Sequence, residues 1–455
     1  MDPLTLSRIQ FGDTAAFHIL WPLLSIGLAF FMFIMEVLWL KTKDVRYYRQ
    51  LRFWIKIFLL SFAIGVASGF PLSFQFGTNW AAFSAAAGSF FGNILGFETT
   101  IAFTLETASL GILVFGWKRV PKLVHLLANL GVLVGSSLSG FWIVAANSWM
   151  QIPHGVILEG GKIVVVDYMA AIFNPSTVVS FAHMWIACIT STLFFMAGIS
   201  AIVLLSKKAD EAKKAFFLHT FKFTLGLALV LTPIQIGVGD LIGEVIAKHQ
   251  PAKLAAVELH WDTNMPGEGA DWAVLAWPNK EGGKNDVEFA LPDALSLIVT
   301  KTQTGEVKGL NEFAPEDRPS ILNSIMVFYS FRIMVGIGML MFALTLWGAW
   351  LWKKKKLVLP TITKHRWFLR AFVLSIPIGF IATEAGWMVR EIGRQPWVIY
   401  GLMRTKDALS AHLEIPVIFS VIASITALYL AMFIAFVYFT VRLVQEGPDL
   451  TSPAP

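Results

Sequence analysis

Nine separate stretches of the sequence are each long enough and apolar enough to cross a lipid bilayer. A helix needs roughly 20 residues, at a rise of 1.5 Å each, to cross a hydrocarbon core of about 30 Å. The stretches cover approximately residues 15–40, 54–75, 93–116, 122–146, 176–206, 216–238, 322–352, 368–389 and 410–442. They are apolar on all sides and lack the period-two alternation of barrel strands. We therefore predict an all-α integral membrane protein, a bundle of nine transmembrane helices.

The composition agrees with a membrane protein. Hydrophobic residues make up 56% of the chain and charged residues 15%, whereas about 25% of a soluble domain is charged. The formal net charge of +6 does not indicate a nucleic-acid partner, because the basic residues lie in short runs between apolar stretches. The single cysteine, Cys188, excludes a disulfide framework and a c-type haem attachment.

Lysine and arginine are concentrated in every second connection between the apolar stretches. The basic connections are 41–56, 118–122, 207–214 and 353–370, whereas 76–92 contains no lysine or arginine. Because such residues favour cytoplasmic loops, we expect the N-terminus outside and the C-terminus in the cytoplasm. The first stretch follows no basic region and has no cleavage site, so we expect it to be retained.

Two outer connections depart from this pattern. Residues 390–409 carry four cations on the outer side, which suggests a bound anionic group. Residues 239–320 form a long connection of mixed charge, either an inert tether or a small external domain. We favour a domain, because loops of this length usually have a function and because 252–261 has a helical pattern. This divides the chain into residues 1–238, 239–320 and 321–455.

Five ionisable side chains on five predicted helices lie at one depth, in the outer half of the membrane. Each alone could be a hydrogen-bonded core residue or could reach to the interface, but charge inside a membrane is costly and often functional. Their shared depth favours a common site. The residues are His18, Glu98, His183, Arg332 and Glu384.

Imidazoles, a carboxylate and cations among many Trp and Phe residues suit a haem better than zinc. A haem–copper centre is disfavoured, because the chain has no paired membrane histidines. A four-histidine cytochrome b is excluded, because only His18 and His183 lie well inside predicted helices. More than one haem would therefore need ligands other than histidine.

Glu98 and Glu106 lie eight residues apart, close to two helical turns and about 12 Å, with Ala102 between them. This spacing leaves a gap beside a small residue in which water could link the two carboxylates. A proton relay is one interpretation. The alternative is that each carboxylate pairs with a neighbouring helix.

Five short strings, in order along the chain, resemble subunit I of the cytochrome bd quinol oxidases. They are QFGTNW at 75–80, NSWMQ at 147–151, FRIM at 331–334, EAGW at 384–387 and GRQPW at 393–397. The resemblance covers nearly all 455 residues. The following string, VIYGLMRT at 398–405, is similar to the cyanide-insensitive branch of that family.

The resemblance implies haem ligands that composition could not reveal. His183 and Met334 match the axial pair of a low-spin haem b. His18 and Glu384 match the ligands of two high-spin haems, one a haem b and the other a haem d or a further haem b. Which of the two residues serves which haem stays open.

The resemblance also assigns roles around the haems. Glu106 with Ser139 matches a proton path from the cytoplasm, Glu98 would lie beside the oxygen-reactive haems, and Arg332 would neutralise charge near the low-spin haem. Two further pairs follow: Lys253 and Glu258 would bind and deprotonate quinol in the short external loop, and Arg390 and Arg394 are candidates for the haem propionates.

The implied function is quinol oxidation at the outer face of a bacterial inner membrane, coupled to reduction of dioxygen to water. Protons taken from the cytoplasm would generate membrane potential without a proton pump. A second multi-span subunit and small single-helix subunits are the expected partners. A transporter remains an alternative, although it would favour internal repeats and broken helices. A non-catalytic membrane cytochrome or assembly subunit is the other alternative.

Overall fold

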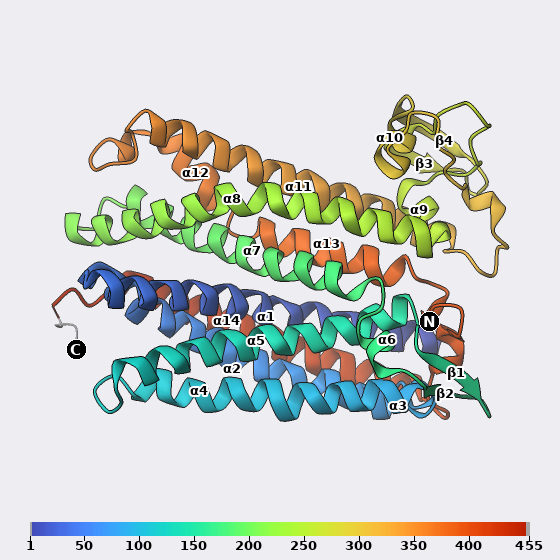
Figure 1. The fold of residues 1–455 in the computed structure, drawn as a ribbon, viewed down its shortest axis with the longest axis horizontal. Coiled ribbons are helices and arrows are strands. Elements are labelled where there is room, and N and C mark those ends of the chain that lie inside the picture. The colour runs from blue at the N-terminus through green and yellow to red at the C-terminus, as the bar shows by residue number, and fades with distance from the viewer. Residues whose placement is uncertain (1, 452–455) are drawn as a thin grey trace.

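Nine helical segments form a bundle in the computed structural model, which describes residues 2–451 (Figure 1). Within these residues nine helical segments have the length and composition to cross a membrane, one for each predicted stretch. The prediction of a nine-helix bundle is thus confirmed. The segments are α1 (Pro3–Thr42), α2 (Val45–Thr78), α3 to α4 (Ala81–Phe115), α5 (Lys122–Gln151), α7 (Thr177–Leu205), α8 (Glu211–His249), α11 (Ile321–Lys353), α12 to α13 (Arg366–Ile392) and α14 (Ile415–Glu446).

The two ends of the bundle differ in what they carry. The N-terminus lies at the end that holds the hairpin β1–β2 (Val156–Glu159 and Lys162–Val165) and α6 (Tyr168–Ile172) (Figure 1). The short hairpin β5–β6 (Trp397–Ile399 and Met403–Arg404) belongs to the same end. α14 ends at the opposite end, where the connections 41–56, 118–122, 207–214 and 353–370 join the helices. The four basic connections therefore lie at one end of the bundle, as their alternation along the sequence predicts.

Polar caps fix where several of these helices begin. The carboxylates of Asp44 and Asp210 accept backbone hydrogen bonds at the starts of α2 and α8, and the Ser320 hydroxyl does so for α11. α8 continues to His249, well past the predicted end of its apolar stretch at 238. This extension carries the external segment away from the bundle (Figure 1).

The external segment is folded. It contains α9 (Pro251–Glu258), the antiparallel hairpin β3–β4 (Trp272–Pro278 and Asn285–Leu291), α10 (Ala294–Thr300) and the short helix η2 (Leu310–Glu312). α9 confirms the predicted helix, and it ends where Leu259 adopts a left-handed conformation, with φ of 47°. Leu259 and Trp261 are buried against Phe328 of α11, so the segment has a small apolar core that it shares with the end of this helix.

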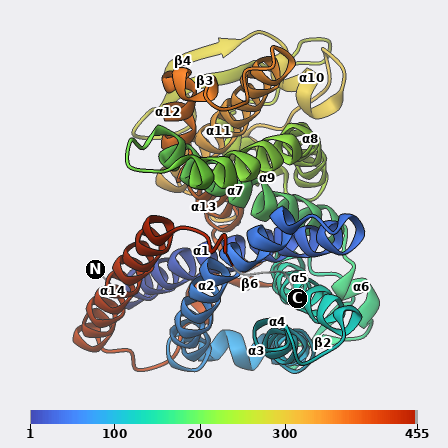
Figure 2. The ribbon, with the colours of Figure 1, turned by 90° about the vertical axis from the view of Figure 1, so that its left-hand side faces the viewer.

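α1 lies between two groups of helices. One group contains α7, α8, α11, α12 and α13, and the other contains α2 to α5 and α14 (Figure 2). α7 is the most enclosed helix, with 89% of its most apolar window buried, against 11% for α14. A Cβ at Gly27 of α1 would lie only 2.2 Å from Thr192 Oγ1 of α7, so glycine allows this close approach. Cys188 is buried at the same interface, against Leu23 and Ile26.

Candidate functional site

His18 of α1 is held so that one ring nitrogen is left with a free lone pair. Its Nδ1 lies 2.9 Å from Ser68 Oγ, and the Ser68 hydroxyl donates to the Gly65 carbonyl oxygen. Because a hydroxyl has one hydrogen to donate, Nδ1–H of His18 is the donor to Ser68. Nε2 is then unprotonated, as in a metal-binding imidazole. A Cβ at Gly69 would lie 3.3 Å from His18 Cε1, so this glycine keeps space open beside the ring.

His183 and Met334 also face glycines on neighbouring helices. A Cβ at Gly239 of α8 would lie 3.2 Å from His183 Cε1, and the Gln235 amide lies 3.2 Å from His183 Nε2. A Cβ at Gly386 of α13 would lie 3.0 Å from the Met334 sulfur. Each of the three donors therefore has a position beside it that a larger residue would obstruct.

Glu384 of α13 carries an unpaired buried atom. Its Oε1 is buried and has no hydrogen-bond partner among residues 2–451. A buried carboxylate oxygen without a partner is costly, so such an atom calls for a ligand from outside the chain. Arg394 Nη1 is likewise buried and unpaired within the described chain.

The residues present fit a haem. Imidazole and thioether are axial donors that proteins supply to haem iron, and both kinds of side chain lie here against glycines of neighbouring helices. The unpaired guanidinium nitrogen of Arg394 suits a propionate oxygen, which would form a charge-assisted hydrogen bond. The side chains could thus hold the porphyrin at its iron and at its edge.

The outer cations differ in how fully they are paired. Arg390 donates to the hydroxyls of Ser180 and Ser148, at 2.9 and 2.8 Å, and also bonds Asn147. Arg394 forms an ion pair with Glu391 at 2.6 Å but keeps Nη1 unpaired. Arg404 pairs with Asp317 of the external segment at 2.6 Å, so it already has a protein counter-ion, which the sequence did not reveal.

Arg332 connects α11 to the external segment. Its Nη2 forms an ion pair of 2.7 Å with Glu258, whose side chain is 5% exposed, and its Nε donates to the Ala273 carbonyl oxygen. Burial raises the pKa of the Glu258 carboxyl above its usual value, although the Arg332 guanidinium acts in the opposite direction. Arg332 is therefore bound to a carboxylate of the external segment. Its predicted position inside a membrane helix did not indicate this contact.

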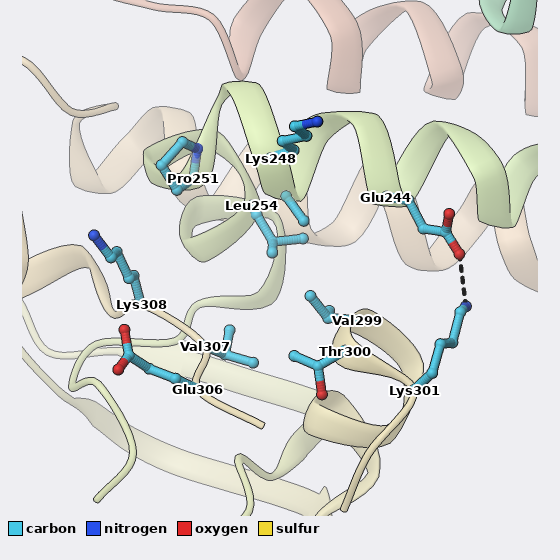
Figure 3. Close-up of a pocket in the computed structure, with 11 residues that line it drawn as sticks. Glu244, Lys248, Pro251, Leu254, Val299, Thr300, Lys301, Glu306, Val307 and Lys308 are labelled. Carbon is cyan, nitrogen blue, oxygen red and sulfur yellow. Dashed lines mark ion pairs between the residues drawn. The ribbon is translucent and has the colours of Figure 1, made fainter. Parts of the chain in front are cut away.

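Two cavities lie in and beside the external segment. The first, of about 610 Å³, is bounded by Lys248 of α8 and by Lys301, whose ammonium pairs with Glu244 at 3.3 Å (Figure 3). The second, of about 480 Å³, is lined by Glu258 and His260. Glu258 therefore forms part of the wall of the second cavity, although its side chain is only 5% exposed.

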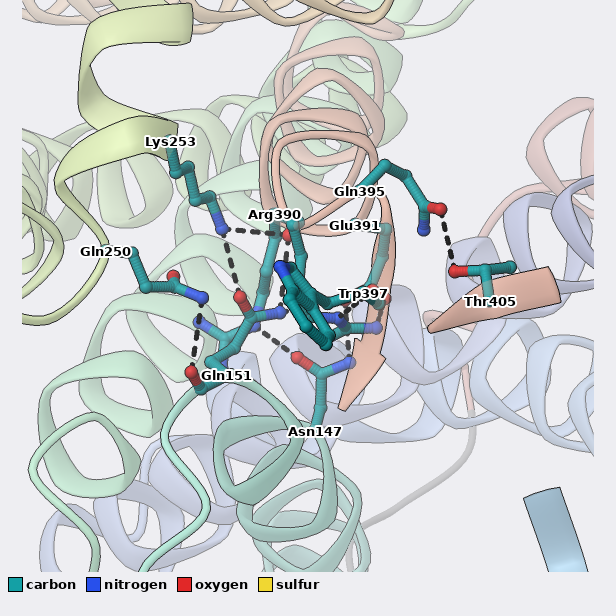
Figure 4. Close-up of polar contacts among 10 residues, drawn as sticks. Asn147, Gln151, Gln250, Lys253, Arg390, Glu391, Gln395, Trp397 and Thr405 are labelled. Carbon is teal, nitrogen blue, oxygen red and sulfur yellow. Dashed lines mark hydrogen bonds and ion pairs between the residues drawn. The ribbon is translucent and has the colours of Figure 1, made fainter. Parts of the chain in front are cut away.

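Lys253 of α9 is enclosed by a polar network (Figure 4). Its Nζ donates to Gln151 Oε1 at 3.1 Å and to the Arg390 carbonyl oxygen at 2.8 Å, and the residue is 2% exposed. Burial, with Arg390 and Arg394 nearby, lowers the pKa of this amine well below its usual value. Lys253 thus links α9 to α5 and α13. Gln151 was not singled out from the sequence, although it ends the string at 147–151.

Glu98 and Glu106 both face α5 because the helix between them is irregular. Residues Glu98–Phe103 form a π-helical segment, η1, between α3 (Ala81–Phe97) and α4 (Thr104–Phe115). Eight residues of regular helix would turn about 80° past two full turns, and a π segment, which adds about one residue, removes most of this difference. Ser139 donates to Glu98 Oε1 at 2.6 Å, and a Cβ at Gly135 would lie 2.7 Å from the Glu106 nitrogen. Ser139 therefore bonds Glu98 and not Glu106, with which the sequence had grouped it.

The fold is that of a multi-span membrane protein, with nine helical segments among residues 2–451 that could cross a bilayer. The chain belongs to the family described as cytochrome bd terminal oxidase subunit I, which matches residues 6–448.

Similar proteins cover almost the whole chain. Cytochrome bd ubiquinol oxidase subunit 1 of Bacillus subtilis (strain 168) is 36% identical over 463 residues, which cover 99% of this chain and 95% of that protein. Cytochrome bd-II ubiquinol oxidase subunit 1 of Escherichia coli (strain K12) is 32% identical, with 98% and 97% covered. The solved structure of bd oxidase from Geobacillus thermodenitrificans matches with a TM-score of 0.87 and 29% identity, over 98% of this chain and 99% of that chain.

Proposed function

We propose that this chain is the haem-containing subunit of a terminal respiratory oxidase that oxidises quinol and reduces dioxygen to water. The observation that carries the proposal is the unpaired, buried Glu384 Oε1 in a bundle whose other donors face glycines. The names of the relatives, which are quinol oxidases, agree with it. The similarity of residues 398–405 to the cyanide-insensitive branch supports the further proposal that the chain belongs to that branch.

The proposed cofactors are a low-spin haem b, a high-spin haem b and a haem d, or a further haem b in place of haem d. His183 and Met334 would hold the low-spin haem, and His18 and Glu384 the two high-spin haems. Bound haem would supply the iron chemistry of electron transfer and oxygen reduction. The protein would fix the iron ligands, and Arg394 with Arg390 would neutralise the propionates.

The external segment, 239–320, is the proposed quinol-binding domain, between two membrane parts at 1–238 and 321–455. Glu258 lines a cavity, and burial raises its pKa, so its carboxylate is a better proton acceptor than an exposed one. Arg332 would hold that carboxylate in place. Lys253, fixed between Gln151 and the Arg390 carbonyl oxygen, would position α9 and orient the quinol.

The protons for oxygen reduction would come from the cytoplasmic end through Glu106 and Glu98, with Ser139 orienting Glu98. With the proposed ligands in the outer half of the membrane, this uptake would create membrane potential without a proton pump. The proposed location is the bacterial inner membrane, with the N-terminus outside and the C-terminus in the cytoplasm. A second multi-span subunit and small single-helix subunits are the proposed partners.

The Glu106→Gln variant tests the proton path together with the oxidase activity. We expect quinol-driven oxygen uptake by the purified complex to fall about tenfold or more, because the amide cannot carry the proton, while haem content stays unchanged. Haem is counted by the pyridine haemochrome spectrum. Glu446→Gln, an exposed position at the end of α14, is the matched control. Normal uptake by Glu106→Gln would refute the relay, and a wild-type complex without haem bands would refute the oxidase.

A further inference from the structure

A buried polar cluster joins three helices at the basic end of the bundle, outside the site described above. Glu36 of α1 accepts from His125 Nδ1 at 2.7 Å and from Asn129 Nδ2 at 2.7 Å, both on α5. His125 Nε2 donates to the Leu113 carbonyl oxygen of α4 at 3.1 Å. The side chains of His125 and Glu36 are 5% and 0% exposed.

The hydrogen bonds of this cluster place one proton between His125 Nδ1 and Glu36 Oε1. The Leu113 carbonyl oxygen and an ionised Glu36 can only accept, so both nitrogens of His125 carry hydrogen when Glu36 is ionised. The same geometry is kept when the shared proton moves to Glu36. The pair can therefore change which partner holds the proton without a rearrangement.

Two unpaired buried atoms extend the cluster in both directions. Asn129 Oδ1 is buried without a partner among the described residues, and so is Trp117 Nε1. The Trp117 ring packs on His125 with centroids 4.2 Å apart, on the side of the α4–α5 connection. Buried polar atoms without protein partners are usually bound by ordered water. Trp117 Nε1 and Asn129 Oδ1 are therefore the two atoms of this region at which an ordered water would complete the hydrogen bonding.

Polar side chains follow one another along the interface of α4 and α5, from the cluster toward Glu98. Ser109 Oγ of α4 would lie 2.2 Å from a Cβ at Gly131, and the backbone of Glu106 makes a similar close approach to Gly135. One turn further along α5, Ser139 bonds Glu98. The two glycines on α5 allow α4 to approach closely, and this places Ser109 and Glu106 on successive turns between Asn129 and Ser139.

We propose that the Glu36–His125 pair takes up protons at the basic end and delivers them through water at Asn129 and Ser109 to Glu106. The proposal rests on the proposed function, because it supplies the start of that proton path. A proton from solvent joins the pair, one proton leaves toward Glu106, and the pair returns to its first state without any change of electron count.

The Glu36→Gln variant tests this role, because glutamine keeps the size of the side chain and loses its proton. We expect oxygen uptake with quinol to fall about tenfold or more. Haem content and the rate of haem reduction by quinol without oxygen should not change, because neither needs protons from this end. Glu36→Asp should recover part of the activity. Ser136→Ala is the matched control, since Ser136 is buried on α5 and bonds only its own helix.

Each outcome decides the proposal. Uptake by Glu36→Gln within twofold of the wild type overturns it, and so does a loss of uptake that follows a loss of haem, which would make the cluster a structural tie. If Glu36→Gln does not assemble, Asn129→Val decides, because it removes Asn129 Oδ1 and the bond from Asn129 to Glu36 but keeps the Glu36–His125 pair; there a fivefold loss at full haem content supports the proposal, and normal uptake, or a loss that follows a loss of haem, overturns it. Slow uptake by Glu106→Gln with normal uptake by Glu36→Gln refutes only this starting point, whereas normal uptake by both refutes the whole path.

Discussion

The bundle contains two sets of polar and donor side chains that differ in how completely the protein satisfies them. In the first set, Glu384 keeps an unpaired buried oxygen and the other donors face glycines. In the second set, both oxygens of Glu36 and both nitrogens of His125 are bonded to protein, and Asn129 Oδ1 is left unpaired among the described residues. The carboxylate of the first set therefore lacks a partner within the described chain, whereas the carboxylate of the second set has its partners there. The first set is His18, His183, Met334 and Glu384, and the second is Glu36, His125 and Asn129.

The largest expected effect is at a donor of the first set. His183→Ala should abolish the low-spin haem band in the reduced-minus-oxidised spectrum, because no other imidazole on α7 can replace the ligand. Quinol-driven oxygen uptake should fall with it. His154→Ala, an exposed position beyond α5, should leave the spectrum unchanged. A low-spin band of normal height in His183→Ala would remove His183 from the ligand set.

The second prediction contrasts the two carboxylates directly. Glu36→Ala leaves His125 and Asn129 without their common partner, and breaking such a buried pair should lower the free energy of unfolding by about 3–5 kcal/mol. Glu384→Ala removes an oxygen that has no protein partner, so it should reduce a high-spin haem band more than it reduces thermal stability. Both are measured on the purified complex, by thermal unfolding and by absorbance. Equal destabilisation by the two variants, with full haem content, would contradict the contrast.

The smallest expected effect concerns Glu258, which combines features of both sets because it is paired yet lines a cavity. Arg332 lowers the pKa of the Glu258 carboxyl, which burial raises, so Arg332→Gln should raise that pKa further. Deprotonation of quinol needs the carboxylate, and activity is lost as the pH falls through its pKa. In the pH profile of the quinol oxidation rate, the acidic limb should thus move to higher pH, by about one unit or less.

The matched control for this shift is Arg404→Gln, which breaks the ion pair with Asp317 and does not contact Glu258. Its acidic limb should coincide with that of the wild type. An acidic limb at lower pH in Arg332→Gln would show that another group accepts the proton.

The membrane bundle could be predicted from the sequence because each crossing needs a long apolar run, which is a strong signal. The end of α8 could not be predicted, since its last turns extend beyond the apolar run and carry polar residues up to His249. The helix α9 was predicted, but its contacts were not: Lys253 is enclosed by residues of α5 and α13 that are far away in the sequence. Periodicity describes one element at a time and does not report which elements meet.

The site residues show the same limit. His18 and Glu384 stood out because charge inside an apolar run is costly, but the proposal of Met334 as a ligand came only from the family resemblance. Glu36 was missed because it lies near the basic end of its apolar run, where a carboxylate can reach the interface. Its partners lie 89 and 93 residues away, beyond any local pattern. The π segment at Glu98–Phe103 was not predicted either, since six residues are too few to separate a π-helical period from an α-helical one.

Cys188 offers a practical consequence of the tight contact between α1 and α7. It is the single thiol of the sequence and is 3% exposed, packed against Leu23 and Ile26. Water-soluble maleimides and methanethiosulfonates need an accessible thiolate, so we expect them not to react with the native protein. One new cysteine on α9 and one on α14 could then carry a pair of spin labels while Cys188 is kept. Their separation would report how far the external segment moves relative to the lipid-facing helices during turnover.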